Sequence, residues 1–399
     1  MKFLHTADWH IGRTLNGFSL KEEQRYAYEQ IVALAKAEAV DGIVIAGDLY
    51  DRSIPPLSAV EELNEMLEHL VVDEQIPVYA ISGNHDSAKR LGFGQAFYPS
   101  HQLFLHTTLL QSIQPIETKE VQLYLLPFVD PSEIRIFCQH VLQETIEQVK
   151  EYRTLAQGIT RIIEEMRQTF DPTKRQVLVT HFAVTKKEQT EHALTNWRTS
   201  ETSSTVGGLA SLTSDLFHDF SYVALGHIHT HFASPSKTIV YSGSPVHFDS
   251  QEAKKEDRKG VYIVDVTQEG IKKNYHELDV KRPIITLEAT FEQLCDREFY
   301  AQYPCGEAWF SIKLLAYDRR QLAGINIRSR LEEIYGTVIE LTFEERVKNE
   351  RKEDPTIGLK ERAPEQTIQM FYETITKQVP SDYQRTVIEE VVNEVLKEK

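Results

Sequence analysis

The sequence predicts a layered α/β fold over roughly its first 270 residues. Short apolar segments rich in β-branched residues alternate with longer segments of helical periodicity. The clearest strand, residues 43–46, is apolar throughout, which is typical of a strand buried on both faces of a sheet. Gly47 allows a sharp turn where this strand ends, and Asp48 follows. Open α/β sheets place their ligands at this carboxyl end of the strands, so Asp48 is the first candidate site residue.

The composition is that of an ordinary globular protein, with 41% hydrophobic and 26% charged residues in 399. This length suits two or three domains. No apolar run could cross a membrane, and the first residues lead directly into a strand, so neither a transmembrane helix nor a signal peptide is expected. The three cysteines are too widely spaced for a metal site and are expected to be reduced cytoplasmic thiols.

The net charge of -16 argues against a protein whose whole surface binds nucleic acid. It does not exclude a site at which metal ions supply the positive charge. The chain has no GxxxxGK[ST] loop and no GxGxxG before a helix. We therefore expect that it binds neither ATP nor a dinucleotide itself.

The first 130 residues predict strands joined by helices. The strands are expected at 2–7, 43–46 and 77–81, with shorter strands over 103–126. Ser19 and Glu22 form a predicted capping box for a helix that ends near residue 39. Pro55 and Pro56 open a second helix. Its apolar face comprises Val60, Leu63, Met66, Leu67 and Leu70.

Residues 131–170 are predicted to be mostly helical. Their apolar stripe comprises Ile146, Val149, Tyr152 and Leu155. This stripe could support self-association or could pack on the protein's own sheet, and the sequence leaves both open. Residues 185–204 are polar and irregular, which favours a mobile loop. The core is completed by strand segments at 176–180, 222–225, 239–245 and 260–265.

The composition shifts near residues 281–283, and a small α+β domain is expected after them. It has predicted strands at 284–289, 308–315 and 338–343 and a helix at 326–335. Residues 344–363 are charged and linker-like. Two helices follow, at 366–376 and 381–396, and Ser381 and Gln384 form a capping box for the second. The expected domains are 1–275, 282–345 and 346–399.

The last predicted helix carries apolar residues at helical spacing. They are Tyr383, Val387, Ile388, Val391, Val392 and Val395. Because five of the six are β-branched, this segment is a poor free helix and needs a packing surface. That surface could be the chain's own small domain. The charged linker before the helix favours a tail that docks on another protein.

The strands of the core end in residue types that bind metal ions. These residues are Asp8, His10, Asp48, Asn84, His181, His227 and His229. Strand ends on one side of a parallel sheet lie close together, so we expect these side chains to meet. They exceed what one ion needs and suit two ions about 3.5–4 Å apart, bridged by one carboxylate. Oxygen and imidazole ligands without thiolate suit Mn²⁺ or Fe²⁺ better than structural zinc.

These motifs resemble those of the calcineurin-like metallophosphoesterases in order and spacing, over about residues 1–270. The matching motifs are Asp8-x-His10, Gly47-Asp48-x-x-Asp51, Gly83-Asn84-His85-Asp86, the isolated His181 and Gly226-His227-x-His229. The resemblance implies a four-layer α/β/β/α core. Further motifs look like those of the SbcD family, the nuclease subunits of bacterial SbcC–SbcD complexes. They are ADWHIG at 7–12, GDLYDR at 47–52 with Pro55 and Pro56, VGG at 206–208 and SGSP at 242–245.

The resemblance also implies a role for each residue. One ion would take Asp8, His10 and His229, the other would take Asn84, His181 and His227, and Asp48 would bridge them. His85 would protonate the leaving oxygen or stabilise the charged phosphate, and Asp51 would orient His85. The implied cofactor is two Mn²⁺ ions, with Mg²⁺ or Fe²⁺ possible. Arg13, Arg52 and Arg90 lie near the motifs and could contact phosphate or form surface salt bridges.

The implied function is that of a Mn-dependent DNA nuclease, acting as a 3'-5' double-strand exonuclease and a single-strand or hairpin endonuclease. It would work with an SbcC-type ATPase in DNA repair, recombination and replication. The small α+β domain would be the family's capping domain, and the C-terminal helices would bind the ATPase. A homodimer within a heterotetramer, in the cytoplasm and associated with the nucleoid, is expected. The alternative is a stand-alone metallophosphatase or small-molecule phosphodiesterase, and a degenerate assembly protein is a third possibility.

Overall fold

A computed structural model describes residues 1–186, 211–254, 258–317, 322, 324–345, 364–376 and 379–397. The chain divides into two compact units, Met1–Glu344 and Glu345–Lys399. Most of the segment predicted to be a mobile loop lies outside the described residues, as do most of the predicted linker and the VGG motif at 206–208. Among the residues that the structure describes, no helix is long and apolar enough to span a membrane.

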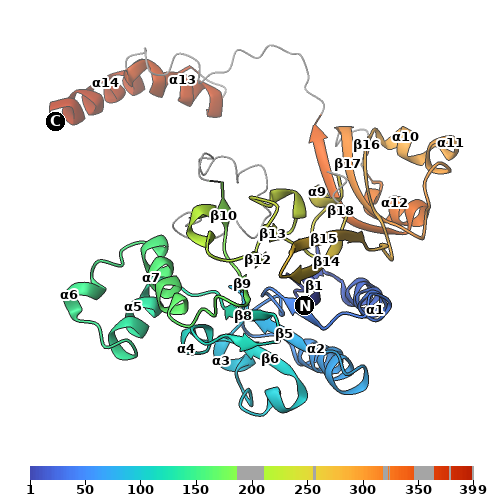
Figure 1. Ribbon diagram of the computed structural model, residues 1–399. Helices are drawn as coiled ribbons and strands as arrows, with labels where there is room; N and C mark the ends of the chain where they lie inside the picture. The colour runs from blue at the N-terminus through green and yellow to red at the C-terminus, as the bar shows by residue number, and fades with distance from the viewer. Residues whose placement is uncertain are drawn as a thin grey trace. The chain divides into compact units, whose positions relative to one another are not determined.

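The first unit contains a six-stranded sheet with the order β15-β14-β1-β4-β5-β6 (Figure 1). The strands are β1 (Lys2–Thr6), β4 (Gly42–Ile45), β5 (Val78–Ile81), β6 (Leu103–His106), β14 (Gly260–Thr267) and β15 (Gly270–Glu277). Strands β1, β4, β5 and β6 are parallel, whereas β14 and β15 run antiparallel to their neighbours. The carboxyl ends of β1, β4 and β5 therefore lie at one edge.

A five-stranded sheet has the order β13-β12-β9-β8-β7. Its strands are β7 (Ile116–Glu117), β8 (Val121–Leu126), β9 (Arg175–Thr180), β12 (Tyr222–Leu225) and β13 (Ile239–Tyr241). All but β7 are parallel. The short pairs β2 (Thr14–Leu15) with β3 (Phe18–Ser19) and β10 (Val184–Thr185) with β11 (Leu212–Thr213) lie outside both large sheets.

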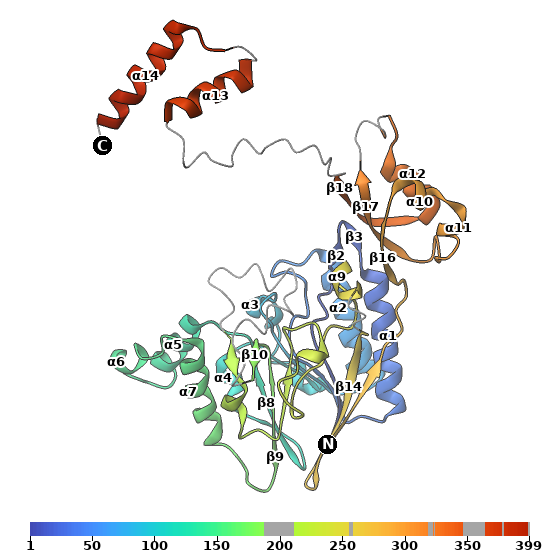
Figure 2. The ribbon, with the colours of Figure 1, turned by 90° about the horizontal axis from the view of Figure 1, so that it is seen from above.

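The two large sheets pack face to face around a largely apolar core. Phe3 and Val44 of the first sheet lie in one cluster with Leu123, Val179 and Val240 of the second. The helices α1 (Lys21–Ala37) and α2 (Leu57–Glu68) cover the outer face of the first sheet. The helices α5 (Pro131–His140) and α7 (Leu155–Arg167) cover that of the second, on the opposite side in Figures 1 and 2. The expected four-layer α/β/β/α arrangement is therefore confirmed.

The start of α1 differs from the prediction. Its N-cap residue is Leu20, and no side chain caps it. Ser19 Oγ accepts a hydrogen bond from the Lys21 amide at 3.2 Å. Glu22 instead forms ion pairs with Lys281 and Arg282 at 3.0 and 3.1 Å. The predicted capping box is wrong because the charge of Glu22 is used across the fold rather than at the helix terminus.

The apolar stripe of the helical region packs mainly on the protein's own sheet. That region comprises α5, α6 (Ile146–Val149) and α7. Val149 and Leu155 are buried in the core cluster of the second sheet, and Tyr152 packs against it. Only Ile146 of the stripe is largely exposed, at 55%. Self-association through this stripe is therefore not favoured. Two further short helices are α3 (Ala88–Leu91) and α4 (Leu109–Ser112).

Residues 284–344, here called the α+β subdomain, form a three-stranded sheet with helices. The sheet order is β16 (Ile284–Ala289), β17 (Trp309–Tyr317) and β18 (Thr337–Glu345). The helices are α10 (Phe291–Cys295), α11 (Arg297–Tyr300) and α12 (Ile327–Tyr335). It has its own apolar core. A smaller cluster joins it to the loops of the sheet sandwich through Leu20, Phe248 and Trp309. The helix α9 (Ser250–Lys254) also contacts its sheet.

The second unit contains α13 (Pro364–Thr376) and α14 (Asp382–Lys397), both labelled in Figure 2. The predicted capping box is present: Ser381 N donates to Gln384 Oε1 at 2.9 Å, and Gln384 N donates to Ser381 Oγ at 3.4 Å. Gln384 also donates to the Tyr372 hydroxyl at 2.9 Å. Most large apolar side chains described in this unit are exposed. They are Ile368, Phe371, Ile375, Val379, Tyr383, Val387 and Val391.

Candidate metal centre

The ends of parallel strands in both sheets supply all seven predicted metal ligands. Asp8 and His10 follow β1, Asp48 follows β4 and Asn84 follows β5 in the first sheet. In the second sheet, His181 follows β9, and His227 and His229 follow β12. The structure thus brings side chains from both sheets to one end of the sandwich, as the sequence predicted.

The backbone at this end has an unusual conformation. Asp8, His10, Asp48 and His227 have φ of 54°, 47°, 52° and 91°. Positive φ is uncommon for residues other than glycine, and clusters of such residues are found at functional sites. The first two loops support each other, because Asp8 N donates to Gly47 O and His10 N to Asp48 O at 3.0 and 2.9 Å. The turns therefore direct these side chains inward.

One group of ligand atoms consists of Asp8, His10 and His229, whose nearest donor atoms all lie within 4.8 Å of one another. His10 Nε2 and His229 Nε2 are 3.2 Å apart. All three side chains are buried, with exposures of 0 to 3%. This is the set that the resemblance assigns to one ion.

The other group surrounds His181 Nε2, which lies 3.0 Å from Asn84 Oδ1. His227 Nδ1 lies 2.9 Å from the same oxygen. The Asp48 carboxylate stands between the two groups: Oδ2 is 3.1 Å from His181 Nε2 and 3.6 Å from His10 Nε2. This is the position that a bridging carboxylate would occupy.

The donor set fits a divalent cation. His181 Nδ1 must donate its hydrogen to Ala46 O, 2.7 Å away, because a carbonyl oxygen can only accept. His181 Nε2 then faces the oxygens of Asn84 and Asp48, and in the neutral ring it would point its lone pair at them. Electron pairs that face one another in a buried site require a cation between them. With oxygen and imidazole donors and no thiolate, the site suits Mn²⁺, Fe²⁺ or Mg²⁺ better than a structural zinc ion.

The pKa shifts of the buried groups also indicate that the site needs positive charge. Burial opposes ionisation of Asp48, but the imidazoles of His181 and His10 outweigh it and lower the pKa of this carboxyl. Burial also opposes protonation of His181, but the carboxylates of Asp48 and Asp8 outweigh it and raise its pKa to about 9. For Asp8, burial and the charge of Asp48 together raise the pKa. A proton on His181 thus supplies the positive charge that a bound metal ion would replace.

Comparison with known proteins agrees with this geometry. Residues 1–231 match the family model described as calcineurin-like phosphoesterase.

The chain belongs to the calcineurin-like phosphoesterase family.

A relative of this phosphoesterase in Staphylococcus saprophyticus subsp. saprophyticus is described as the SbcD subunit of the nuclease SbcCD. The two are 29% identical over 398 residues, which cover 100% of this chain and 99% of the relative. Among solved structures, the protein TT1561 of Thermus thermophilus is 11% identical with a TM-score of 0.37, over 69% of this chain and 98% of that one. A dimetal phosphatase from Danio rerio has the same identity and TM-score, over 70% and 99%.

His85 lies beside the phosphoesterase centre, and its contact with Asp51 differs from the expected one. His85 Nδ1 lies 2.8 Å from the main-chain oxygen of Asp51. The Asp51 carboxylate is bonded to Arg13 instead, at 2.8 Å. Asp51 therefore contacts the His85 ring through its main-chain oxygen. The printed contact between the two residues thus runs through the Asp51 main chain, while its carboxylate is paired with Arg13.

The three candidate phosphate-binding arginines have different surroundings. Arg13 is held between Asp51 and the ring of Phe248, which its guanidinium faces at 5.0 Å. Arg52 is 59% exposed and 3.4 Å from the same carboxylate. Arg90 is exposed in α3 and lines a separate groove. Of the three, Arg13 and Arg52 contact Asp51, whose main-chain oxygen lies beside His85.

Two carboxylates near the centre were not predicted to have a role. Asp86 accepts hydrogen bonds from the amides of Leu49, Tyr50 and Gly83 at 2.9 to 3.1 Å, which ties the β4 and β5 loops together. Burial, followed by the charge of Asp48, raises the pKa of Asp86 to about 6. Glu252, from α9, lies 3.3 Å from His229 Nδ1. Asp86 stands inside a recognised motif, whereas nothing in the sequence near Glu252 signals this contact.

The centre is closed on one side and open on the other. Asp8, His10 and His181 are fully buried, whereas Asn84 is exposed and His85 and His227 are half-buried. A substrate phosphate can therefore approach from the side of Asn84. That side carries His85, the residue expected to act on the leaving group.

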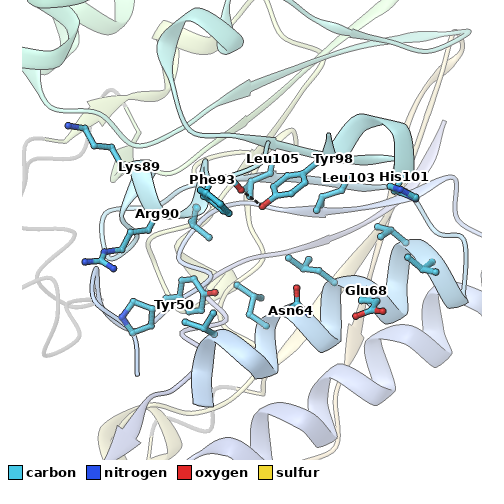
Figure 3. Close-up of a pocket in the computed structure, with 17 residues that line it drawn as sticks. Tyr50, Asn64, Glu68, Lys89, Arg90, Phe93, Tyr98, His101, Leu103 and Leu105 are labelled. Carbon is cyan, nitrogen blue, oxygen red and sulfur yellow. Dashed lines mark hydrogen bonds between the residues drawn. The ribbon is translucent and has the colours of Figure 1, made fainter. Parts of the chain in front are cut away.

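A separate apolar groove of about 850 Å³ lies away from the metal-ligand cluster, between α2 and the segment that carries Phe93, Tyr98 and His101 (Figure 3). None of the seven ligands lines it. Tyr98 donates to the Phe93 carbonyl at 2.6 Å across one wall. The groove therefore has no part in metal binding.

Glycines allow the loops of the centre to pack closely. A Cβ atom at Gly83 would stand 2.2 Å from Asp48 Oδ1 and 2.4 Å from Asp48 N. One at Gly226 would stand 1.9 Å from Ala46 O, and one at Gly47 would stand 2.4 Å from His181 Nδ1. The glycines that precede Asp48, Asn84 and His227 are thus required because a side chain there would clash with neighbouring atoms.

We predict that Gly83→Ala displaces Asp48 and lowers Mn²⁺ affinity by at least about tenfold, as loss of ligand support usually does. Calorimetric titration with Mn²⁺ measures this. Gly158→Ala is the control, because Gly158 lies in α7, away from the centre, and its Cβ would contact only the Ile134 side chain, with Cδ1 at 2.8 Å. Equal Mn²⁺ affinity in the Gly83→Ala and wild-type proteins would contradict the steric argument.

Proposed function

We propose that this phosphoesterase is the Mn²⁺-dependent nuclease subunit of a DNA-processing complex with an SbcC-type ATPase. It would act as a 3'-5' double-strand exonuclease and as a single-strand or hairpin endonuclease in DNA repair, recombination and replication. The observation that carries the proposal is the meeting of seven oxygen and imidazole side chains at one end of the sandwich, with Asp48 between His10 and His181. The full-length likeness to the SbcD subunit of the nuclease SbcCD supports it.

In this proposal, Asp8, His10 and His229 hold one ion, Asn84, His181 and His227 hold the other, and Asp48 bridges. A pair of divalent ions held there would lower the pKa of water from 15.7 towards about 7, and would so supply a nucleophile for hydrolysis of a phosphodiester. The protein's own part is to fix the ligand geometry. The hydrogen bond from His181 to the Ala46 carbonyl and the contact of His229 with Glu252 orient both imidazoles.

His85 is the proposed acid or charge stabiliser. Its Nδ1 hydrogen is used in the bond to the Asp51 carbonyl, which directs Nε2 away from that bond. Its ring lies 4.8 Å from that of His10, and its donor atom falls within 4.8 Å of those of His10 and Asp48. From this place it can donate a proton to the leaving oxygen of a phosphate held at the open side of the centre.

The alternative is a stand-alone phosphatase or small-molecule phosphodiesterase on the same core. The α+β subdomain and the unit with α13 and α14 favour the nuclease, since a small substrate has no evident need for either. The net charge of -16 fits a subunit that shares DNA binding with a partner. The cytoplasm, in association with the nucleoid, is the proposed location.

The C-terminal helices are the proposed binding site for the ATPase. In α14, Tyr383 and Val391 are 79% and 50% exposed, and Phe371 and Ile375 of α13 are 67% and 66% exposed. A pair of short helices with this much apolar surface is marginal alone and is stabilised by packing on a partner. The division of the chain at Glu344 and Glu345 agrees with a separate docking unit.

The proposed oligomeric state is a homodimer within a heterotetramer. The groove between α2 and α3 offers a surface for it, because Val60, Val72 and Phe93 on its walls are 39 to 84% exposed. Ile54 and Leu57 nearby are 67% and 73% exposed. Apolar surface concentrated in this way marks an interaction site, and the proposed occupant is the same surface of a second copy.

We expect Mn²⁺-dependent cleavage of labelled duplex DNA, stimulated by the partner ATPase with ATP. Generic phosphate esters should be hydrolysed slowly and without any effect of the partner. Parallel assays of both substrates, each with and without Mn²⁺ and the ATPase, test the function. Efficient ester hydrolysis with intact DNA would favour the alternative.

Asp48→Asn and His85→Ala should separate metal binding from chemistry. Asp48→Asn removes the bridging charge, so metal content and DNA cleavage should fall together. His85→Ala should retain both ions and DNA binding, while cleavage falls by roughly 10²–10⁴-fold, the range for a positioned acid or base. Metal analysis, DNA binding and cleavage are measured on the same preparations. If His85→Ala loses metal as Asp48→Asn does, His85 is a ligand and the role assigned to it is wrong.

A variant that ends at Arg346 should fold, bind both ions and cleave a simple phosphodiester in Mn²⁺, because the first unit has its own core. It should fail to co-elute with the ATPase and should lose ATP-dependent cleavage of duplex DNA. Size-exclusion chromatography with the partner measures this. Within the full-length chain, Tyr383→Glu should weaken the complex and Ile136→Glu, at another exposed apolar position, in α5, should not. Normal co-elution of the shortened chain would place the partner surface elsewhere.

Phe93→Glu should convert a dimer, with twice the chain mass of 46.0 kDa, into a monomer. The buried charge would cost more than the apolar contacts of the groove can offset. Light scattering coupled to chromatography gives the mass, and Ile136→Glu, on the opposite helical layer, is again the control. A dimer that persists in Phe93→Glu would exclude this groove as its interface.

A further inference from the structure

His229 is held at two points by a buried ion pair, once at its imidazole and once at its main chain. Its Nδ1 lies 3.3 Å from Glu252 Oε1, and its main-chain oxygen accepts a hydrogen bond from Lys259 Nζ at 2.8 Å. Glu252 Oε2 lies 3.0 Å from the same Lys259 Nζ. The side chains of Glu252 and Lys259 are only 9% and 1% exposed. The pair is therefore a built part of the interior and not a surface contact.

This contact determines which nitrogen of His229 faces the metal-ligand cluster. An ionised carboxylate only accepts hydrogen bonds, so Nδ1 carries the hydrogen and Nε2 presents its lone pair. Nε2 is the atom that lies 3.2 Å from His10 Nε2, within the first ligand group. A carboxylate on the far nitrogen of a metal-binding histidine fixes its tautomer and ring orientation and raises its basicity.

Glu252 is carried by α9, and both ends of this short helix are bonded to the α+β subdomain. Ser250 Oγ donates to Glu340 Oε2 of β18 at 2.8 Å. Lys254 Nζ lies 2.6 Å from Glu288 Oε1 of β16. Between them in the helix, the Glu252 side chain contacts His229 instead. The same helix thus touches the subdomain and the candidate metal centre.

His181 provides a contrast within the same site. Its Nδ1 donates to the Ala46 carbonyl, which directly follows β4 in the six-stranded sheet. That support belongs to the sheet and does not involve α9. The two imidazoles are therefore held by different parts of the fold, one by the sheet and the other by a helix that the subdomain holds in place.

We propose that Glu252 is a positioning residue for His229, and that α9 makes metal binding at the Asp8–His10–His229 group depend on the placement of the α+β subdomain. This inference rests on the metal site of the proposed function and adds a physical link between that site and the subdomain. A displacement of β18 or β16 would pull α9, move the Glu252 carboxylate and release the His229 ring. Affinity for the ion would then fall although none of the metal-binding residues had been substituted.

The test measures Mn²⁺ binding to the full-length chain by isothermal titration, with metal content as a second readout and no activity assay. Glu252→Gln keeps the shape of the side chain but removes its charge. It should weaken one of the two Mn²⁺ sites by about 10–100-fold, the usual effect of losing such a partner, and leave the other site unchanged. Glu62→Gln is the matched control, because Glu62 is also a buried glutamate but lies in α2.

The link through α9 is tested by Ser250→Ala, which removes the bond to Glu340 and leaves the metal-binding and Glu252 side chains intact. It should weaken the same Mn²⁺ site, and its effect should not add to that of Glu252→Gln in the double variant. Ser311→Ala is the control, since Ser311 donates to the same Glu340 oxygen at 2.7 Å but lies on β17 and not on α9. It should bind Mn²⁺ as the wild type does.

The possible outcomes separate the proposed function, the positioning role of Glu252 and the link through α9. If the wild type binds no Mn²⁺, the proposed function itself fails. If it binds two ions and Glu252→Gln binds both with unchanged affinity, the positioning role is wrong. Should Glu252→Gln weaken one site while Ser250→Ala matches Ser311→Ala, the transmission through α9 is wrong. Thermal melting of each variant identifies loss of folding, and Ser250→Ala, a small change in a partly buried bond, keeps the test open if Glu252→Gln is unstable.

Discussion

The burial of two aspartates at the end of the sheet sandwich is the constraint on which the rest of the centre depends. Asp8 and Asp48 are 0% and 2% exposed, and the charge of Asp48 raises the free energy of ionising Asp8. A buried carboxylate is costly unless hydrogen bonds and positive charge offset the loss of water. Main-chain amides supply part of this, since His227 N donates to Asp8 and His85 N to Asp48, at 2.9 and 2.8 Å. The imidazoles supply a further part, and divalent metal ions would supply the remainder.

The same constraint explains the backbone around these residues. Amides can reach a buried carboxylate only if the loops approach within contact distance, and the glycines at 47, 83 and 226 provide that space. The positive φ of the ligands turns their side chains back into the sandwich. The strain of these turns is offset by the apolar core between the two sheets, which fixes the strand ends from which the loops start. Stability of the core and geometry of the site are therefore linked.

The sequence predicted the fold and the meeting of the ligands because both depend on local patterns. An apolar strand followed by Gly-Asp or Gly-His carries its own signal, and parallel strands bring such ends together whatever the details between them. The contacts that it did not predict are between residues far apart in the chain. Glu252 and His229 are joined only by tertiary structure, and Arg13 takes the Asp51 carboxylate because of how the first two loops pack. The polar edge strand β15 was likewise not predicted, since Lys272, Lys273 and His276 obscure the alternation of its apolar residues.

The left-handed backbone at Asp8, His10, Asp48 and His227 limits which residues can ever occupy these positions. Asp, Asn and His are several times more frequent than other non-glycine residues in that region of φ, and they are also types that bind divalent ions. Backbone shape and ligand chemistry therefore select the same small set of amino acids. In a lineage that abandoned the chemistry but kept the fold, drift at these four positions would pass through Asn and Gly first. The backbone conformation of the site would then still restrict these positions after the metal-binding charges had been lost.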